Sequence, residues 1–232
     1  MKYIGVIRND FPEKFGLPRQ SGLAPSLLSK VIMEGPYRVP EAFRGIESFS
    51  HLWLLWEFEP VGSPEETFSP TVRPPKLGGN ERVGVFATRS PNRPNRIGMT
   101  LVRLVRYEID PSLGPVLTVA GADMKDGTKI LDIKPYLPYA DSVPEASGSF
   151  AEERADKRLN VIWEAAPPSE MEKEKIVALE EALSLDPRPG YQQDPERIYQ
   201  MSYGQWTVGF RIDEAVHIIL IEENQGGSYD HS

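Results

Sequence analysis

The middle third of the chain holds the densest group of side chains that could bind a phosphate, a carboxylate or a nucleotide. Residues 71–106 contain eight basic residues and a single acid, Glu81. The stretch has a net charge of +7, which leaves −15 for the rest of a chain whose formal net charge is −8. Seven of the basic residues are arginine, whose planar fork matches phosphate and carboxylate oxygens. This asymmetry favours a local site for an anionic partner over a set of solvated surface arginines.

A loop rich in hydrogen-bond donors runs through that stretch. Residues 71–87 read TVRPPKLGGNERVGVFA and residues 88–99 read TRSPNRPNRIGM. Proline and glycine fix the backbone while arginine and asparagine supply donors, which suits a ligand with carboxylate, ribose or phosphate groups better than it suits an ordinary surface loop. The residues predicted to position a substrate in this stretch are Arg73, Asn92, Arg93, Asn95 and Arg96.

A second candidate site follows a predicted strand, at residues 121–138, which read GADMKDGTKILDIKPYLP. Asp126-Gly127 is a hairpin signal, so one interpretation is a simple turn. The other is that the backbone of residues 122–125 hydrogen-bonds the edge of an adenine. Spacing alone does not separate the two.

Several common signatures of catalytic sites are missing from the sequence. The chain has no cysteine, which excludes disulfides, thiolate nucleophiles and thiolate zinc sites. The motifs G-x-G-x-x-G after a strand, G-x-x-x-x-G-K-[ST] and H-E-x-x-H do not occur. His51, His217 and His231 are too scattered to predict a metal site, and His51, beside Leu52-Trp53, is typical of a core histidine.

Length and hydropathy predict a protein that folds without a disulfide or a metal. A chain of 232 residues can form one large domain or two small ones. The start, MKYIGVIRND, lacks the apolar core of a signal peptide. The apolar runs Leu52–Trp56 and His217–Ile221 are far shorter than the roughly 20 residues that span a bilayer. We therefore expect a cytoplasmic protein without a membrane partner.

The first part of the chain, residues 1–143, is predicted to be a small antiparallel β-barrel. Short apolar, β-branched runs recur between glycine and proline, and no long helical pattern separates them, which argues against a parallel doubly wound sheet. One short helix is expected at Ala42–Phe49. The expected strands are Tyr3–Ile7, Val31–Met33, Leu52–Phe58, Val83–Ala87, Leu101–Tyr107, Val116–Ala120 and Lys129–Ile133.

Residues 150–232 are predicted to form a small α+β domain, after a linker at Ser142–Glu153. A strand is expected at Asn160–Glu164. Ser169 and Glu172 fit a capping box that opens a helix, which should end before Asp186. The runs Trp206–Ile212 and Val216–Ile221 predict a hairpin around Asp213-Glu214.

At these residues the chain resembles the TsaA-like family, in particular its TrmO-type tRNA methyltransferases. The resemblance covers nearly the whole chain in the family's order. Arg96 departs from it, because the family pattern has proline there. The matching segments are IGVIR (4–8), EKFGLPRQSGL (13–23), RGIESFSHLWLL (44–55), TVRPPKLGGNERVGVFATRS (71–90), RPNRIGM (93–99), DGT-x-x-LDIKPYLPYADS (126–142) and DPRPGY (186–191).

The resemblance implies a six- or seven-stranded antiparallel barrel, a homodimer and a cofactor site near the dimer interface. It implies transfer of a methyl group from S-adenosylmethionine to N6 of threonylcarbamoyladenosine, beside the anticodon of certain tRNAs. The cofactor contacts that it implies are Ser21, Gly22, Leu23, Glu59, Pro60, Arg89, Leu101, Ala122, Asp123, Met124 and Lys125.

The same resemblance leaves the acid–base chemistry open. The sulfonium already activates the methyl group, so alignment and exclusion of water matter more than a catalytic triad. Asp126 and Tyr136 are the candidates for a general base. Arg188 is predicted to add a contact to the substrate from the C-terminal part.

Two alternatives remain open from the sequence. The first is a non-catalytic module on the same barrel that senses S-adenosylmethionine or binds RNA. The second is a methyltransferase for a small molecule or a protein, whose activity would ignore tRNA and show little salt dependence.

Overall fold

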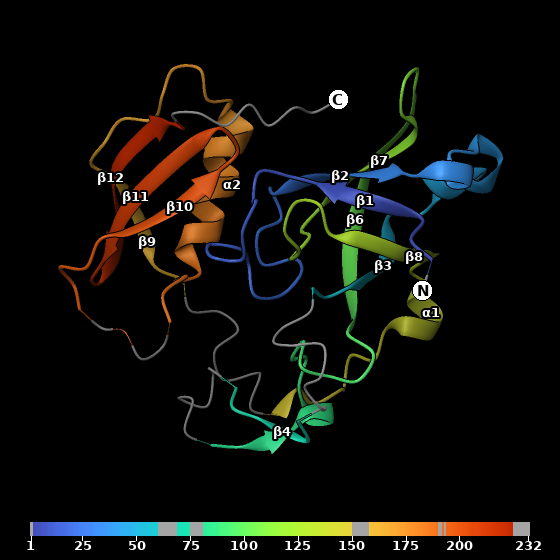
Figure 1. Ribbon diagram of the computed structural model, residues 1–232, viewed down its shortest axis with the longest axis horizontal. Helices are drawn as coiled ribbons and strands as arrows, with labels where there is room; N and C mark the ends of the chain where they lie inside the picture. The colour runs from blue at the N-terminus through green and yellow to red at the C-terminus, as the bar shows by residue number, and fades with distance from the viewer. Residues whose placement is uncertain are drawn as a thin grey trace.

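The computed structural model describes residues 2–59, 69–74, 81–149, 158–189, 192 and 194–224. Figure 1 shows a barrel of N-terminal strands beside a C-terminal sheet that carries the long helix α2. The fold is mainly β with an α+β C-terminal part, as the sequence predicts. No helix in the described parts of the chain is long and apolar enough to cross a membrane.

A closed six-stranded barrel occupies the N-terminal half, in the order β1-β2-β7-β6-β3-β8. Every neighbouring pair is antiparallel, which confirms the expected barrel. Closure gives each strand a neighbour on both sides, although the first residues of β6 pair with β3 alone. The strands are β1 (Gly5–Arg8), β2 (Leu28–Met33), β3 (His51–Glu57), β6 (Ile97–Asp110), β7 (Gly114–Ala120) and β8 (Lys129–Pro135).

Alternation along the strands decides which side chains fill the barrel. In β3, Leu52, Leu54 and Trp56 are buried while the residues between them are partly exposed. Successive side chains of a strand point to opposite faces, so this pattern sends one set inward. The inward sets form one core whose members all lie between Ile4 and Ile133.

Two of the connections between barrel strands, β2 to β3 and β3 to β6, contain short 3-10 turns. The helix expected at 42–49 is instead two such turns, η2 (Pro40–Phe43) and η3 (Ile46–Ser48), interrupted at Gly45, which has a φ of 87°. The strand expected at 83–87 lasts only two residues before η5 begins. The remaining short elements of this half are η1 (Gly35–Tyr37), β4 (Thr71–Val72), β5 (Val83–Gly84), η5 (Val85–Ala87) and α1 (Pro138–Asp141).

The turn at Asp126-Gly127 is real but does not make a hairpin. It joins β7 to β8, and these strands are not neighbours in the barrel. Its amide groups pair elsewhere: Asp126 N donates to the Phe11 carbonyl at 2.7 Å and Gly127 N to the Ile7 carbonyl at 2.9 Å. The dipeptide signal was right about the turn and wrong about the strands that it connects.

The C-terminal part is a four-stranded sheet of order β10-β11-β12-β9, on which α2 packs. The predicted hairpin at Asp213 is confirmed by the antiparallel pairing of β11 and β12. Strand β9 lies parallel to β12, and β10 is a strand that the sequence did not predict. The elements are β9 (Asn160–Trp163), α2 (Lys173–Ser184), β10 (Tyr199–Tyr203), β11 (Trp206–Ile212) and β12 (Ala215–Glu223).

Helix α2 begins later than the capping box predicts. Its N-cap is Glu172, and no side chain caps it, so the expected role of Ser169 is wrong. Ala178, Leu179, Ala182 and Leu183 are buried against the sheet. Their spacing forms one apolar stripe, so packing defines this helix more than its N-terminal cap does.

The C-terminal core also contains residues from near the start of the chain. Phe11, Ala24 and Leu27 lie in the connection between β1 and β2, and all three are buried among residues of α2 and the C-terminal sheet. Phe11 packs edge-on against Tyr203, with ring centroids 5.1 Å apart. Residues 9–27 therefore connect the two halves of the fold.

Candidate cofactor and substrate site

Two loops that the resemblance assigned to the cofactor meet beside the barrel. Gly22 N donates to the Gly121 carbonyl at 3.0 Å. A Cβ on Gly121 would lie 3.2 Å from the backbone of Gly22, and Gly121 has a φ of 80°. Only glycine suits that conformation at such a close approach. The contact joins the Ser21–Leu23 loop to the segment at residues 121–125.

Arg89 lies at the same junction. Its guanidinium donates to the Gln20 side chain at 2.7 Å. It also acts on the Asp123 carboxyl, where its positive charge favours the ionised form and lowers the pKa. The loop after η5, the 19–23 loop and the 121–125 segment thus converge on one place.

Asp123 is the most unusual group there. Burial raises the pKa of its carboxyl above the ordinary value, and the hydrogen bond from Thr100 offsets only part of that rise. Thr100 Oγ1 donates to Asp123 Oδ1 at 2.7 Å and accepts from Trp56 Nε1 at 2.9 Å. The chain of bonds fixes the carboxyl against β6 and β3. A partly desolvated acid beside an arginine is typical of a functional site.

The edge of β6 is open next to this acid. Its register with β7 begins at Arg103, opposite Ala120, so the earlier residues of β6 pair with β3 alone. Leu101 lies in that stretch and points outward, because Thr100 and Val102 on either side of it are buried. Ala122 and Met124 are buried in the barrel core. Of these two residues, only the backbone is placed to contact a ligand.

The remaining predicted cofactor residues lie at the end of β3. Glu59 accepts an ion pair from Lys125, with the two charged atoms 2.6 Å apart, so it holds the 121–125 segment near that strand. Pro60 lies outside the described residues.

Some of the predicted substrate residues form hydrogen bonds within their own loop, and others have side chains that form none with the described residues. Arg93 donates to the carbonyls of Thr88 and Ser90, so it stabilises its own loop. The backbone N of Asn92 donates to the Ser90 hydroxyl, and no hydrogen bond joins its side chain to another described residue. The side chains of Arg73 and Asn95 form no hydrogen bond with any described residue, and Arg73 is exposed.

Arg96 adopts a conformation that the family's proline cannot. Its φ is 33°, whereas a proline ring holds φ near −65°. Its carbonyl accepts from Phe58 N at 2.8 Å, and its guanidinium lies 3.8 Å from a Glu57 oxygen. The loop therefore differs locally from the pattern that the resemblance implies.

Arg188 is held in the C-terminal part. Its guanidinium pairs with Asp186 and donates to the Ile212 carbonyl, and only 17% of its side chain is exposed. Its own carbonyl accepts from Arg19, the neighbour of Gln20, at 2.9 Å. Arg188 thus touches the cofactor loop through Arg19 and does not present its charge alongside the other predicted arginines.

The two candidate bases lie at opposite ends of β8. Seven residues of strand separate Asp126 from Tyr136, which at about 3.3 Å per residue is about 23 Å. Both oxygens of Asp126 are engaged, with Arg8 at 3.1 Å and with the amide N of Asn9 at 2.9 Å. Tyr136 lies against the rings of His51 and Trp53. One active centre in a single subunit cannot use both.

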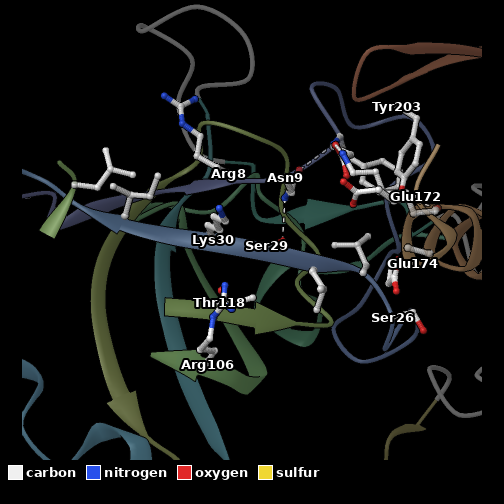
Figure 2. A pocket seen from close by; sticks show the side chains of 18 residues that line it. Arg8, Asn9, Ser26, Ser29, Lys30, Arg106, Thr118, Glu172, Glu174 and Tyr203 are labelled. Carbon is white, nitrogen blue, oxygen red and sulfur yellow. Dashed lines mark hydrogen bonds and ion pairs between the residues drawn. The ribbon is translucent and has the colours of Figure 1, made fainter. Parts of the chain in front are cut away.

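A cleft of about 530 Å³ lies elsewhere, between the barrel and α2. It contains none of the predicted site residues. Figure 2 shows Arg8, Lys30 and Arg106 on its barrel side and Glu172 and Glu174 near the helix. Sequence reasoning missed it because its wall combines residues 8–11, 26–32, 106–118 and 172–178, which are distant in sequence. Within the described residues, no group of histidine, aspartate and glutamate side chains could hold a metal ion.

Comparison with known proteins shows the family of this chain. Residues 6–142 match the tRNA-methyltransferase O N-terminal domain, and residues 156–224 match the TrmO C-terminal domain. The Escherichia coli K12 protein named tRNA (adenine(37)-N6)-methyltransferase is 41% identical over 224 residues, which cover 91% of this chain and 92% of that protein.

Two further relatives come from Pseudomonas aeruginosa. RcsF, which is named for S-adenosylmethionine dependence, is 41% identical over 204 residues, covering 84% of this chain and 85% of that protein. A crystal structure of TrmO matches with a TM-score of 0.72 and 32% identity, over 95% of this chain and 97% of that one. The chain belongs to the tRNA-methyltransferase O family.

Proposed function

We propose that this protein moves a methyl group from S-adenosylmethionine to N6 of threonylcarbamoyladenosine at position 37 of tRNA. Methylation of N6 of adenine 37 is the activity for which its Escherichia coli relative is named. The observation that supports a cofactor site in this chain is the junction of Gly22, Gly121, Arg89 and Asp123 beside the open edge of β6.

The residues at this junction fit S-adenosylmethionine. The Gly22–Gly121 approach fixes the Ser21–Leu23 loop against the 121–125 segment, so both are held in place for a ligand bound beside them. The Arg89 fork suits the carboxylate of the methionyl part. Asp123 and Glu59 suit its hydroxyl and ammonium groups. The site therefore offers an acceptor or a donor for each polar part of the molecule.

The protein's contribution is mainly positioning. When bound, S-adenosylmethionine supplies a methyl group that its sulfonium has already activated. Arg89 and the 121–125 backbone orient the ligand, and the substrate loop at residues 92–96 holds the target base in line. Alignment of this kind can lower the activation free energy of methyl transfer by about 7–11 kcal/mol. A carbamoyl group acidifies the N6–H, so water or a weak base is sufficient to accept the proton.

We also infer a homodimer, in the cytoplasm. The outward residues Ile97, Met99 and Leu101 of β6 form an apolar strip beside Leu55 of β3. Met99 is 56% exposed and Ile97 is 38% exposed. A second copy would cover this strip and close the open side of the cofactor site. Light scattering of the wild type should give the mass of a dimer, and Met99→Glu should shift it toward a monomer.

The activity is tested with purified protein, S-adenosylmethionine and two tRNA preparations. One carries threonylcarbamoyladenosine at position 37, and the other has plain adenosine there. Mass analysis of the digested nucleosides should show one added methyl group on the threonylcarbamoylated base alone. Transfer to both tRNAs, or to neither, would contradict the proposal, and tight cofactor binding without any transfer would favour the sensor alternative.

The cofactor site is tested by Arg89→Ala, with Arg82→Ala as the matched control. Arg82 belongs to the same basic stretch but donates to the Thr71 hydroxyl at the β4–β5 sheet. Loss of a hydrogen bond from a charged group costs about 1.5–3 kcal/mol, so Arg89→Ala should weaken cofactor affinity about 10- to 100-fold. Titration calorimetry should show no such change for Arg82→Ala.

A further inference from the structure

Four side chains form a single row across the outside of the barrel. The strand register pairs Arg8 of β1 with Lys30 of β2, Lys30 with Thr118 of β7, and Thr118 with Arg106 of β6. Residues that are directly paired across a sheet point to the same face. Figure 2 shows the four residues along the barrel wall of the cleft. We call this set the cationic row.

Arg106 joins the row because β6 contains a bulge. Leu104 and Tyr107 both pack against the barrel core, although strict alternation would send Tyr107 outward when Leu104 points inward. The register shifts between Leu104 and Arg106, which adds one residue and turns Arg106 outward opposite Thr118. Bulges of this kind commonly redirect a side chain toward a site.

Two members of the cationic row, Lys30 and Thr118, have polar groups that form no hydrogen bond with the described residues. Arg8 pairs with Asp126 at 3.1 Å and Arg106 with Glu108 at 3.0 Å, but Lys30 forms no ion pair or hydrogen bond with any described residue. Thr118 is 8% exposed, and its hydroxyl has no hydrogen-bond partner among the described residues. Like charges directly opposite each other, as Arg8 and Lys30 are, destabilise a sheet. What Lys30 offers the fold is a Coulombic attraction to the Asp110 carboxylate, without a direct ion pair among the described residues.

The surroundings restrict where an anion can lie. Across the cleft, Asp10 is neutralised by Lys175 at 2.9 Å, while Glu172 and Glu174 carry negative charge. A polyanion is therefore repelled from the helix side and attracted to the barrel wall. Adjacent strands are about 4.8 Å apart, so Lys30 and Arg106, two strands apart, can contact two anionic groups that lie about 10 Å apart. This elongated row suits a phosphate chain better than one small anion.

We propose that the cationic row docks the sugar–phosphate backbone of the RNA substrate. The inference rests on the proposed function and adds a contact surface away from the cofactor junction. The two are connected: Asn9, which follows Arg8, donates through its side chain to the Met124 carbonyl at 2.9 Å and through its amide to Asp126. RNA held on the row is thereby positioned against the 121–125 segment. An acidic protein needs such a local cationic surface to bind RNA.

The test is Lys30→Gln in the full-length protein, measured against an unmodified tRNA transcript at several salt concentrations. We expect affinity to fall about 3- to 10-fold, and the slope of log affinity against log salt to flatten by about 0.7–0.9, the value for one phosphate contact. The midpoint of thermal unfolding should change little, because the variant loses both the repulsion between Lys30 and Arg8 and the attraction between Lys30 and Asp110. The KM for tRNA should rise while the affinity for S-adenosylmethionine stays unchanged.

Lys134→Gln is the matched control, because Lys134 lies on β8 of the same barrel and pairs with Asp132. An equal change of salt slope in both variants would overturn the proposal, since it would reflect net charge alone. Saturable binding of inorganic phosphate that depends on Lys30, with the RNA salt slope unchanged, would also overturn it. If the wild type transfers no methyl group but Lys30→Gln still flattens the slope, the RNA contact stands and the proposed function fails.

Discussion

The two halves of the molecule differ in how local their cores are. All members of the barrel core lie between Ile4 and Ile133. The C-terminal core instead combines α2 and its sheet with Phe11, Ala24 and Leu27 from the connection between β1 and β2. The C-terminal part is thus completed by the N-terminal half of the chain.

That difference links the stability of one half to the chemistry of the other. The 9–27 connection that completes the C-terminal core also carries Ser21–Leu23 to the cofactor junction. Ser26 bonds to Glu181 of α2 through both its amide and its hydroxyl, and Arg158 donates to the Leu23 carbonyl. The C-terminal part therefore helps to hold the Ser21–Leu23 loop in place. Among the described residues, no C-terminal residue belongs to the barrel core.

The largest effect is expected from Phe11→Ala. Removal of a buried phenylalanine costs about 3–5 kcal/mol of unfolding free energy. Because Phe11 anchors the 9–27 connection, the affinity for S-adenosylmethionine should fall as well. Phe43→Ala is the matched change, since Phe43 is buried at the barrel and stacks on Tyr107. Urea unfolding and calorimetry measure both quantities. Equal losses of cofactor affinity in the two variants would remove the claimed asymmetry.

Gly98→Ala should disturb the barrel side alone. A Cβ at Gly98 would lie 2.2 Å from the Trp56 ring, which is fixed by its bond to Thr100. Overpacking of this kind costs about 1–3 kcal/mol. The displaced ring should also disturb the bond between Thr100 and Asp123. Gly84→Ala meets no atom within 4 Å and serves as control. A thermal midpoint that drops equally for both variants would argue against a tight barrel interior.

A smaller effect, with a distinctive pH dependence, is expected from Asp123→Asn. Burial raises the pKa of Asp123 in the folded state above its value in the unfolded state. The stability that the neutral carboxyl contributes is therefore complete below the unfolded-state pKa and is lost as the pH rises through the folded-state pKa. Asparagine keeps an oxygen that can accept from Thr100 and does not ionise. The thermal midpoint of the variant relative to wild type should therefore rise between pH 4 and pH 7.5. A difference that is constant over this range would show that the carboxyl is not desolvated.

The smallest effect, of opposite sign, is expected at the C-terminal sheet. His217 lies between Glu164 and Asp213, and Arg211 pairs with the same two acids. Hydrogen bonds from His217 and from the Ala215 amide lower the pKa of Glu164 and Asp213 respectively. Their contribution is therefore present above the unfolded pKa and is lost as pH falls.

Glu164→Gln should accordingly be slightly less stable than wild type at pH 7, and the gap should close by pH 3. The two acids are partly exposed to solvent, so the effect is small and weakens with salt. Urea unfolding at the two pH values measures it. If the difference in unfolding free energy between Glu164→Gln and wild type grew toward low pH, Glu164 would have the same sign of pH dependence as Asp123, which contradicts this prediction.

The local pattern of the sequence determined where most strands lie. The apolar run Leu52–Trp56 is sufficient to predict β3, but Trp53 and Leu55 are as apolar as their neighbours, so only the structure shows that Leu52, Leu54 and Trp56 face inward. Motifs distributed along the whole chain pointed to the family, which the comparisons confirm. The turn at Asp126-Gly127 was also visible, although its partners were not.

Only the tertiary structure decided which strands are neighbours, and hence which residues form sites. Lys30 and Arg106 become members of one row because β7 lies between β2 and β6 and because β6 bulges. Asp123, which follows β7, bonds to Thr100 of β6 because β6 and β7 are neighbours in the barrel. A period of two fixes the face of each side chain, but it carries no information about strand order, register or bulges. Those depend on how the closed barrel and the 9–27 connection pack, which is a property of the whole chain.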